Sequence, residues 1–173
     1  MMTLVTAFVL IACADEASSN DGVAGEQIMK FDTARVRLAT PRETLQLTLE
    51  LAVTSDQKTM GLMERRHLDP NAGMLFIYDS MQPADAGFWM FRTRIPLDIA
   101  FLDSAGVIRS TKRMQPCEAT IAQGCPTYPP DVPYRYALEV NAGYFEQHGV
   151  GVGSKLMLGD VPRAGAPTTG AKP

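Results

Sequence analysis

Apolar and polar residues alternate along the chain between residues 36 and 53. Val36 and Leu38 flank a charged residue, and beyond the turn-forming segment 40–43 five apolar residues recur at every second position as far as Val53. Successive side chains of a strand point to opposite faces, so an alternation of period two is typical of a strand with one buried face. The pattern predicts a β-hairpin over residues 36–53.

Short apolar segments farther along the chain predict more strands, separated by turns rich in Pro, Gly and Asp. The expected strands cover residues 74–78, 88–91, 99–102, 107–113, 134–140 and 155–158, and the expected helices cover residues 55–66 and 142–147. We therefore expect an α+β, mainly β fold. It would be a single compact domain of seven or eight short strands, in a barrel-like or strongly bent sheet, with two short helices.

Residues 87–103 hold the densest mixture of aromatic, aliphatic and charged residues, including Trp89, the only tryptophan. Within this stretch Asp98 lies between two apolar residues at the start of a predicted buried strand. A buried carboxylate is costly unless it is paired, and Arg92 and Arg94 are the nearest candidate partners. Two interpretations stay open. Asp98 is a structural residue that accepts backbone or arginine hydrogen bonds, or it forms an Asp–Arg pair that lines a cleft.

The first residues have the composition of an export signal. The apolar run 4–12 is far shorter than the roughly 20 residues that a membrane-spanning helix needs, and a polar stretch follows it. Residues 10–13 resemble a bacterial lipobox, in which the cysteine, here Cys13, receives lipid. Residues 12–14 also fit the small-residue site of ordinary export. We expect an extracytoplasmic, periplasmic protein, anchored to a membrane by lipid at Cys13.

The predicted organisation is a signal peptide or lipobox over 1–13, a polar linker over 14–31, one globular domain over 32–159 and a disordered tail over 160–173. The whole chain has 173 residues and a net charge of −3, without a long basic run. Because nucleic-acid binding depends on a basic surface, we expect no nucleic-acid partner. Nothing in the sequence specifies an oligomeric state.

Two cysteines, Cys117 and Cys125, lie in a short segment that contains Pro and Gly. In an oxidising compartment such a pair is most simply a disulfide. A thiolate metal site or a nucleophilic cysteine is the alternative, but the pair lacks both the two-residue spacing of a redox motif and nearby histidines.

Known sequence motifs for metal, nucleotide or nucleophilic catalysis are absent from the chain, and we expect no metal and no cofactor. The chain does contain ten methionines, and an exported protein can bind copper(I) through thioethers. The candidate thioethers are Met60, Met63, Met74, Met81, Met90 and Met114. Four of them lie within apolar patterns, where methionine usually fills irregular space in a core.

Six separated motifs occur in order along the chain. They are Met60-Gly61-Leu62-Met63-Glu64-Arg65, Gly73-Met74-Leu75-Phe76, Phe88-Trp89-Met90, the run from Ile95 to Asp103, Pro116-Cys117, and Tyr136-Ala137-Leu138-Glu139-Val140. This series resembles the domain of unknown function 192 family over about residues 33 to 158. The resemblance implies a compact β-rich domain that is often exported and has no established activity. The chain departs from the family pattern at 57–58 and 91–92, so no shared chemistry is expected there.

Two functions fit the sequence. The first is a binding module of the cell envelope, in which Arg65, Trp89, Arg94 and Asp98 recognise a small polar ligand or an envelope polymer. The second is a hydrolase or lyase that acts on envelope material, with Asp98 or Glu139 as acid or base. The second function requires the two carboxyl groups to converge on one pocket. Sequence spacing leaves open whether the protein is an enzyme.

Overall fold

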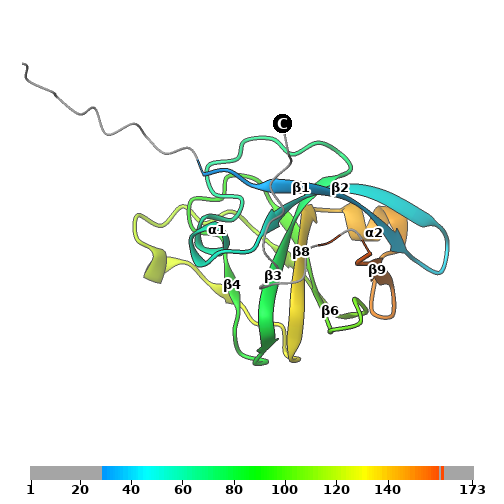
Figure 1. Ribbon diagram of the computed structural model, residues 1–173. Coiled ribbons are helices and arrows are strands. Elements are labelled where there is room, and N and C mark those ends of the chain that lie inside the picture. The colour runs from blue at the N-terminus through cyan, green and yellow to red at the C-terminus, as the bar shows by residue number, and fades with distance from the viewer. Residues whose placement is uncertain (1–28, 160, 162–173) are drawn as a thin grey trace, which may run out of the picture.

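The computed structural model describes residues 29–159 and residue 161. Its main element is a curled sheet of seven strands (Figure 1). The elements in chain order are β1 (Asp32–Ala39), β2 (Thr44–Ala52), α1 (Ser55–Met60), β3 (Ala72–Gln82), β4 (Phe88–Trp89), β5 (Leu97–Leu102), β6 (Ile108–Met114), the 3₁₀ turn η1 (Ala122–Gly124), β7 (Thr127–Tyr128), β8 (Tyr134–Asn141), α2 (Tyr144–His148) and β9 (Lys155–Met157). The predicted signal, Cys13, most of the predicted linker and nearly all of the predicted tail lie outside the described residues.

The strands of the main sheet follow the order β6-β5-β8-β3-β2-β1-β9, and the β2–β3 pair is its only parallel one among the described residues. The sheet curls so far that its two edges meet at one end. Val107, next to β6, forms an antiparallel bridge with Lys155 of β9. The N–H of Ile108 also donates to the carbonyl of Ser154 at 2.9 Å. The predicted strongly bent, mainly β domain is confirmed.

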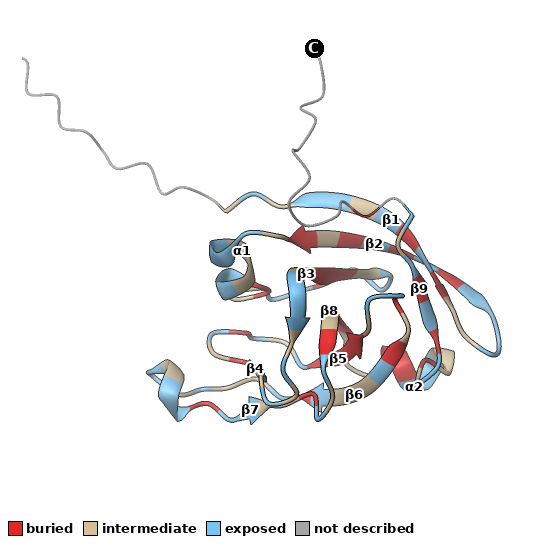
Figure 2. Ribbon diagram, turned by 60° about the horizontal axis from the view of Figure 1, so that its bottom comes forward, coloured by how far each residue is buried: buried red, intermediate tan, exposed pale blue. Residues whose placement is uncertain are grey.

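One hydrophobic core fills the inside of the curl. The predicted alternation in the first hairpin produces it, because Leu45, Leu47, Leu49 and Leu51 of β2 are all buried and their neighbours mostly face outward. The inner faces of the other main-sheet strands and the helix α2 complete this core. Figure 2 colours the buried residues of these elements red. The hairpin therefore supplies one wall of the half-barrel.

A second core lies on the other face of β3, β5 and β8. It contains Met74 and Phe76 from β3 and Ile99 and Phe101 from β5. Strands in the middle of the sheet are thus buried on both sides, and all six residues of β5 are buried. Figures 1 and 2 show α1 and the small β4–β7 sheet at one end of the curved sheet, with α2 at the opposite end. The candidate site described below lies at the end with α1.

The helix predicted over residues 55–66 is shorter in the structure. Thr54 caps α1 through a capping box with Gln57, and the helix ends before Gly61, which has a positive φ of 48°. A residue in that region of backbone space cannot continue a right-handed helix. Within the described part of the chain, no helix has both the length and the apolar composition needed to cross a membrane.

The strand predicted over residues 88–91 is also shorter. Only Phe88 and Trp89 pair as a strand, with β7 in a separate two-stranded sheet. Arg92 has a φ of 57°, so the chain turns sharply there instead of extending. Trp89 is 41% exposed. This part of the chain is therefore a covering segment over the second core and not a central strand.

Candidate functional site

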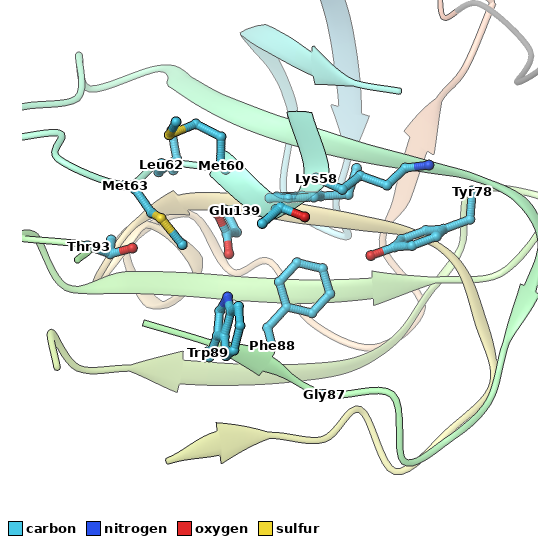
Figure 3. A pocket seen from close by; sticks show the side chains of 13 residues that line it. Lys58, Met60, Leu62, Met63, Tyr78, Gly87, Phe88, Trp89, Thr93 and Glu139 are labelled. Atoms are coloured by element: carbon cyan, nitrogen blue, oxygen red, sulfur yellow. The ribbon is translucent and has the colours of Figure 1, made fainter. Parts of the chain in front are cut away.

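A cavity of about 250 Å³ opens between α1, the turn that follows it, and β4, with β3 and β8 as its floor (Figure 3). Its lining residues are Lys58, Thr59, Met60, Gly61, Leu62, Met63, Phe76, Tyr78, Gly87, Phe88, Trp89, Thr93 and Glu139. Seven of its eleven lining side chains are apolar or aromatic, and the other four are polar. That composition is typical of small-molecule sites.

The lining of this cavity contains one carboxyl group, that of Glu139. Glu139 lies in β8 directly between Met74 of β3 and Ile99 of β5, on the face of the second core, and is only 4% exposed. Its carboxyl group makes no hydrogen bond or ion pair with any described residue, and burial raises its pKa from 4.5 to about 8. A buried acid without a partner is rare because desolvation of its charge is costly.

Thr93 adds a buried hydroxyl group to the cavity wall. In Figure 3 the Thr93 hydroxyl, the Glu139 carboxyl group and the indole nitrogen of Trp89 are turned toward the interior of the cavity. Trp89 and Thr93 come from one segment of the chain, and Glu139 comes from β8. They offer a ligand one acidic group, one hydroxyl and one N–H donor beside an aromatic surface.

The other end of the cavity contains Lys58 and Tyr78. The Nζ atom of Lys58 lies 4.8 Å from the centre of the Tyr78 ring, a cation–π arrangement. Partial burial lowers the pKa of Lys58, against an opposing effect of Asp79. Burial raises the pKa of the Tyr78 phenol well above its usual value. Tyr78 is therefore uncharged at neutral pH, and Lys58 is the cationic group of this wall.

The rim beside Trp89 is held by an ion cluster around Glu64. Its carboxylate accepts from Nε of Arg92 and from Nε of Arg94, both at 2.6 Å, and its N–H donates to the Arg92 carbonyl at 2.8 Å. Glu64 and Arg92 both have positive φ values, of 62° and 57°. Such conformations are unfavourable for these residue types unless surrounding contacts hold them. The cluster thus ties the turn after α1 to the segment that carries Trp89.

The predicted binding residues do not all meet at the cavity. Trp89 lines it, but Arg94 pairs with Glu64, and Nη2 of Arg65 pairs with Glu50 at 2.6 Å, so neither arginine belongs to the lining. The participation of these residues in binding stays a prediction. The sequence gives no signal for Thr93 or Lys58, because only the fold brings α1 and residues 88–93 together at the cavity.

Asp98 lies on the opposite face of the sheet from Glu139. The register pairs Asp98 with Val140, whereas Glu139 pairs with Ile99, and adjacent residues of a strand point to opposite sides. The two carboxyl groups therefore do not converge on one pocket. This geometry does not support a catalytic pair of Asp98 and Glu139.

Both carboxylate oxygens of Asp98 accept hydrogen bonds from neighbouring residues. The side chain accepts from Nε of Arg113 at 2.9 Å and from the backbone N–H groups of Gly143 at 2.9 Å and Phe145 at 3.2 Å. The expectation that Arg92 or Arg94 would be its partner is wrong, because Arg113 is the residue directly across the β5–β6 pair. Asp98 thus joins the sheet to the start of α2.

The predicted disulfide between Cys117 and Cys125 is present in the structure. It closes the segment just before β7, and β7 pairs with β4 so that Trp89 lies opposite Thr127. Phe91 also forms a parallel bridge with Cys117. The disulfide-closed segment therefore supports the wall of the cavity that carries Trp89.

Within residues 29–159 and residue 161, no group of three or more His, Cys, Asp or Glu side chains is placed to hold a metal ion. The six methionines considered for copper do not gather at one place. Met60 and Met63 line the cavity, and Met74, Met90 and Met114 are completely buried in the second core. Met81 is exposed and belongs to neither set. Buried methionines of this kind serve as core packing.

The solved structures that resemble this chain include two bacterial proteins. A proposed transcription regulator from Sinorhizobium meliloti is 37% identical, with a TM-score of 0.67, and the match covers 75% of this chain and 96% of that one. A protein of unknown function from Novosphingobium aromaticivorans is 28% identical, with a TM-score of 0.64, covering 72% and 84%. No curated protein matches the chain significantly.

The fold, the order of the motifs and these likenesses agree with a match to a family model. That model, described as "Uncharacterized ACR", matches residues 36–158 and therefore most of the described domain. The chain belongs to the domain of unknown function 192 family.

Proposed function

We propose that this protein is an exported binding protein of the cell envelope, anchored by lipid at Cys13, that holds a small polar ligand in the cavity beside Glu139. The carboxyl group of Glu139 would bind the polar part of the ligand, and Trp89 would cover its apolar part. A cavity of about 250 Å³ is slightly smaller than the pockets that hold drug-sized ligands, so it would take a small envelope compound or one end of an envelope polymer.

The observation that carries the proposal is the state of Glu139. Its carboxyl group is 4% exposed, faces an open cavity and has no partner among the described residues. Burying a polar group without a hydrogen bond costs on the order of 1–3 kcal/mol, so such a group is unexpected where it only supports the fold. A ligand that hydrogen bonds to Glu139 would offset this cost.

Two features of the sequence and structure support export. The segment ending at Cys13 resembles a lipobox, and the chain forms a disulfide between Cys117 and Cys125. Structural disulfides persist in oxidising compartments and are rare in the cytosol. Lipid chains at Cys13 would then keep the domain next to a membrane, with residues 14–31 as the connection.

Catalysis by Glu139 alone is the second candidate function. A pKa of about 8 suits a general acid at neutral pH, and this observation favours a hydrolase or lyase. Such an enzyme would use Glu139 without Asp98, which faces the other side of the sheet. It would also need a second reacting group from the substrate or from water.

A role in transcription regulation through DNA binding has less support here, although the Sinorhizobium meliloti relative is described as a proposed transcription regulator. The chain has a net charge of −3. The α-helices of the described region are six and five residues long. Proteins that recognise DNA with a helix require a recognition helix that enters the major groove, and a basic surface.

Trp89 provides the test, because it is the only tryptophan and it lines the cavity. Its fluorescence would be followed during titration with amino acids, amines, sugars and peptidoglycan fragments, in parallel with the melting temperature. A true ligand changes the emission and raises the melting temperature. At about 100 times the dissociation constant the ligand adds roughly 2.7 kcal/mol to stability.

Glu139→Gln is the informative variant, and Glu146→Gln is its matched control. Glu146 has an 83% exposed side chain and lies in α2, away from the cavity. Loss of the response in Glu139→Gln alone supports the proposed site. Identical responses in both variants would place the binding elsewhere, and turnover of a bound compound that depends on Glu139 would favour the enzyme instead.

A further inference from the structure

We infer that the ligand of this cavity is a small organic cation, an amine in its ammonium form or a quaternary ammonium, whose charge pairs with Glu139 and whose body packs on Trp89. The inference rests on the proposed function, since it names the chemical class of ligand for the same cavity. Three observations on separate elements lead to it.

The first observation is that the cations at both ends of the row of residues that contains Glu139 already have acidic partners. The register places Lys112, Ile99, Glu139, Met74 and Glu50 in one row across the sheet, so their side chains share a face. At one end of the row Lys112 pairs with Asp131. At the other end Glu50 pairs with Arg65. The Glu64 cluster likewise pairs both Arg92 and Arg94. Glu139, in the middle of the row, has none of these cations as its partner.

The second observation concerns Lys58, the remaining cation of the cavity. Its Nζ atom lies over the Tyr78 ring and forms no ion pair with Glu139. The phenols of Tyr78 and of Tyr134, which packs against Tyr78, cannot supply a positive charge, because a phenol ionises only to an anion. Burial also raises the pKa of both phenols, so they stay neutral. The protein groups that face Glu139 therefore leave its carboxyl group without a counter-ion, and a bound cation would provide one.

The third observation is the aromatic wall. Trp89 is the best partner for a cation among aromatic residues, and it lines the cavity together with Phe88, whose ring packs edge-on against Phe76 at 4.9 Å. An organic cation can use the carboxyl group and the aromatic surface at once. A hard metal cation would require several oxygen ligands, and Glu139 is the only carboxyl group among the lining residues.

Proton linkage follows from this arrangement and offers a sharp test. Burial raises the pKa of Glu139 to about 8, so the empty cavity holds a protonated, neutral carboxyl group at neutral pH. A cation prefers the ionised group and therefore releases a proton from it on binding. Below pH 8 the ionised fraction falls about tenfold per pH unit, and the affinity for a non-titrating cation falls with it. Above pH 8 the affinity levels off.

The experiment uses two matched pairs of compounds on the folded protein. Choline is compared with 3,3-dimethyl-1-butanol, which has the same shape without the charge, and benzylamine is compared with benzyl alcohol. Affinities are measured by calorimetry and by Trp89 fluorescence from about pH 6 to about pH 9, the range over which Glu139 titrates. Calorimetry in two buffers of different ionisation enthalpy counts the released protons. Choline carries no titratable proton in this range, so a released proton must come from the protein.

We expect both cations to bind more tightly than their neutral counterparts, by about 10- to 100-fold at pH 8, the usual size of a charge-assisted hydrogen bond or ion pair. Choline affinity should rise with pH as far as about 8 in the native protein and in Glu146→Gln. In Glu139→Gln it should be weaker and independent of pH. Trp89→Leu, a change at a partly exposed residue, should weaken choline binding without removing its pH dependence.

Two outcomes would overturn the inference, and they have different consequences for the proposed function. If the neutral alcohols bind as tightly as the cations and still require Glu139, the cavity binds ligands but not because of their charge, and the proposed function survives. If no compound of either class changes Trp89 emission at millimolar concentration, and the broader panel fails as well, the proposed function fails together with the inference.

Discussion

Oδ2 of Asp98 accepts the backbone N–H of Gly143 at 2.9 Å, which fixes the first turn of α2 against β5. A second N–H of the same turn and the Arg113 side chain complete the contacts of this carboxylate. Replacing Asp98 by Ala removes all three, and we expect a loss of about 2–4 kcal/mol in the free energy of unfolding. Asp98→Asn should lose less, because the amide oxygen can still accept. Urea denaturation measures both.

The binding properties of these two variants separate a structural role from a direct one. Since Asp98 faces away from the cavity, either variant should bind cavity ligands normally once it is folded. Loss of ligand affinity in a stably folded Asp98→Asn would contradict this prediction and indicate that Asp98 takes part in binding.

Glu139 should make the stability of the protein fall as the pH rises. Its pKa is 4.5 in the unfolded chain and about 8 in the fold, so between these values the folded state holds a proton that the unfolded state has lost. The free energy of unfolding therefore declines with pH across this window and is constant above it. The full effect is roughly 3–5 kcal/mol, at the usual 1.36 kcal/mol per pKa unit.

Glu139→Gln lacks this titration, so its advantage over the native protein should grow from near zero at pH 4.5 to its maximum near pH 8. Denaturant midpoints at a series of pH values test the prediction, with Glu146→Gln as the charge-matched control. Parallel pH profiles for the native protein and Glu139→Gln would show that Glu139 ionises freely in the fold.

The disulfide between Cys117 and Cys125 should matter for the cavity as well as for stability. The loop it closes spans a sequence separation of 8, for which chain-entropy reasoning gives about 2–3 kcal/mol of stabilisation. Reduction, or the double change of both cysteines to serine, should also loosen β7 against β4. We expect a shift in Trp89 emission and weaker ligand binding. Unchanged emission and affinity after complete reduction would mean that the wall holds without the disulfide.

Cys13 should determine whether the protein stays with the membrane. Cys13→Ser removes the thiol to which lipid would be attached, so the protein should move from the membrane fraction to the soluble extracytoplasmic fraction. Incorporation of a labelled fatty acid into the native protein, but not into the variant, measures the modification directly. A native protein that is soluble and unlabelled would favour ordinary export at residues 12–14.

The sequence predicted the hairpin β1–β2 well, because its period-two pattern reflects a purely local rule. The segments 88–91 and 55–66 were predicted too long for different reasons. The helix α1 ends where Gly61 takes a positive φ, whereas β4 ends at Trp89 because its partner β7 is only two residues long. The turn at Arg92, which also has a positive φ, is held by contacts with Glu64, which is distant in sequence and gives no local signal.

The sequence by itself determined the strands of the main sheet, the mainly β class and the cysteine pair, since alternation, turn residues and cysteine spacing can be seen without the fold. Only the tertiary structure decided which carboxyl group faces the cavity. Asp98 and Glu139 each interrupt an apolar strand, and their roles differ because the β5–β8 register turns them to opposite faces. Register is set by packing across the whole sheet, so the partner of Asp98 and the isolation of Glu139 become visible only when distant segments meet.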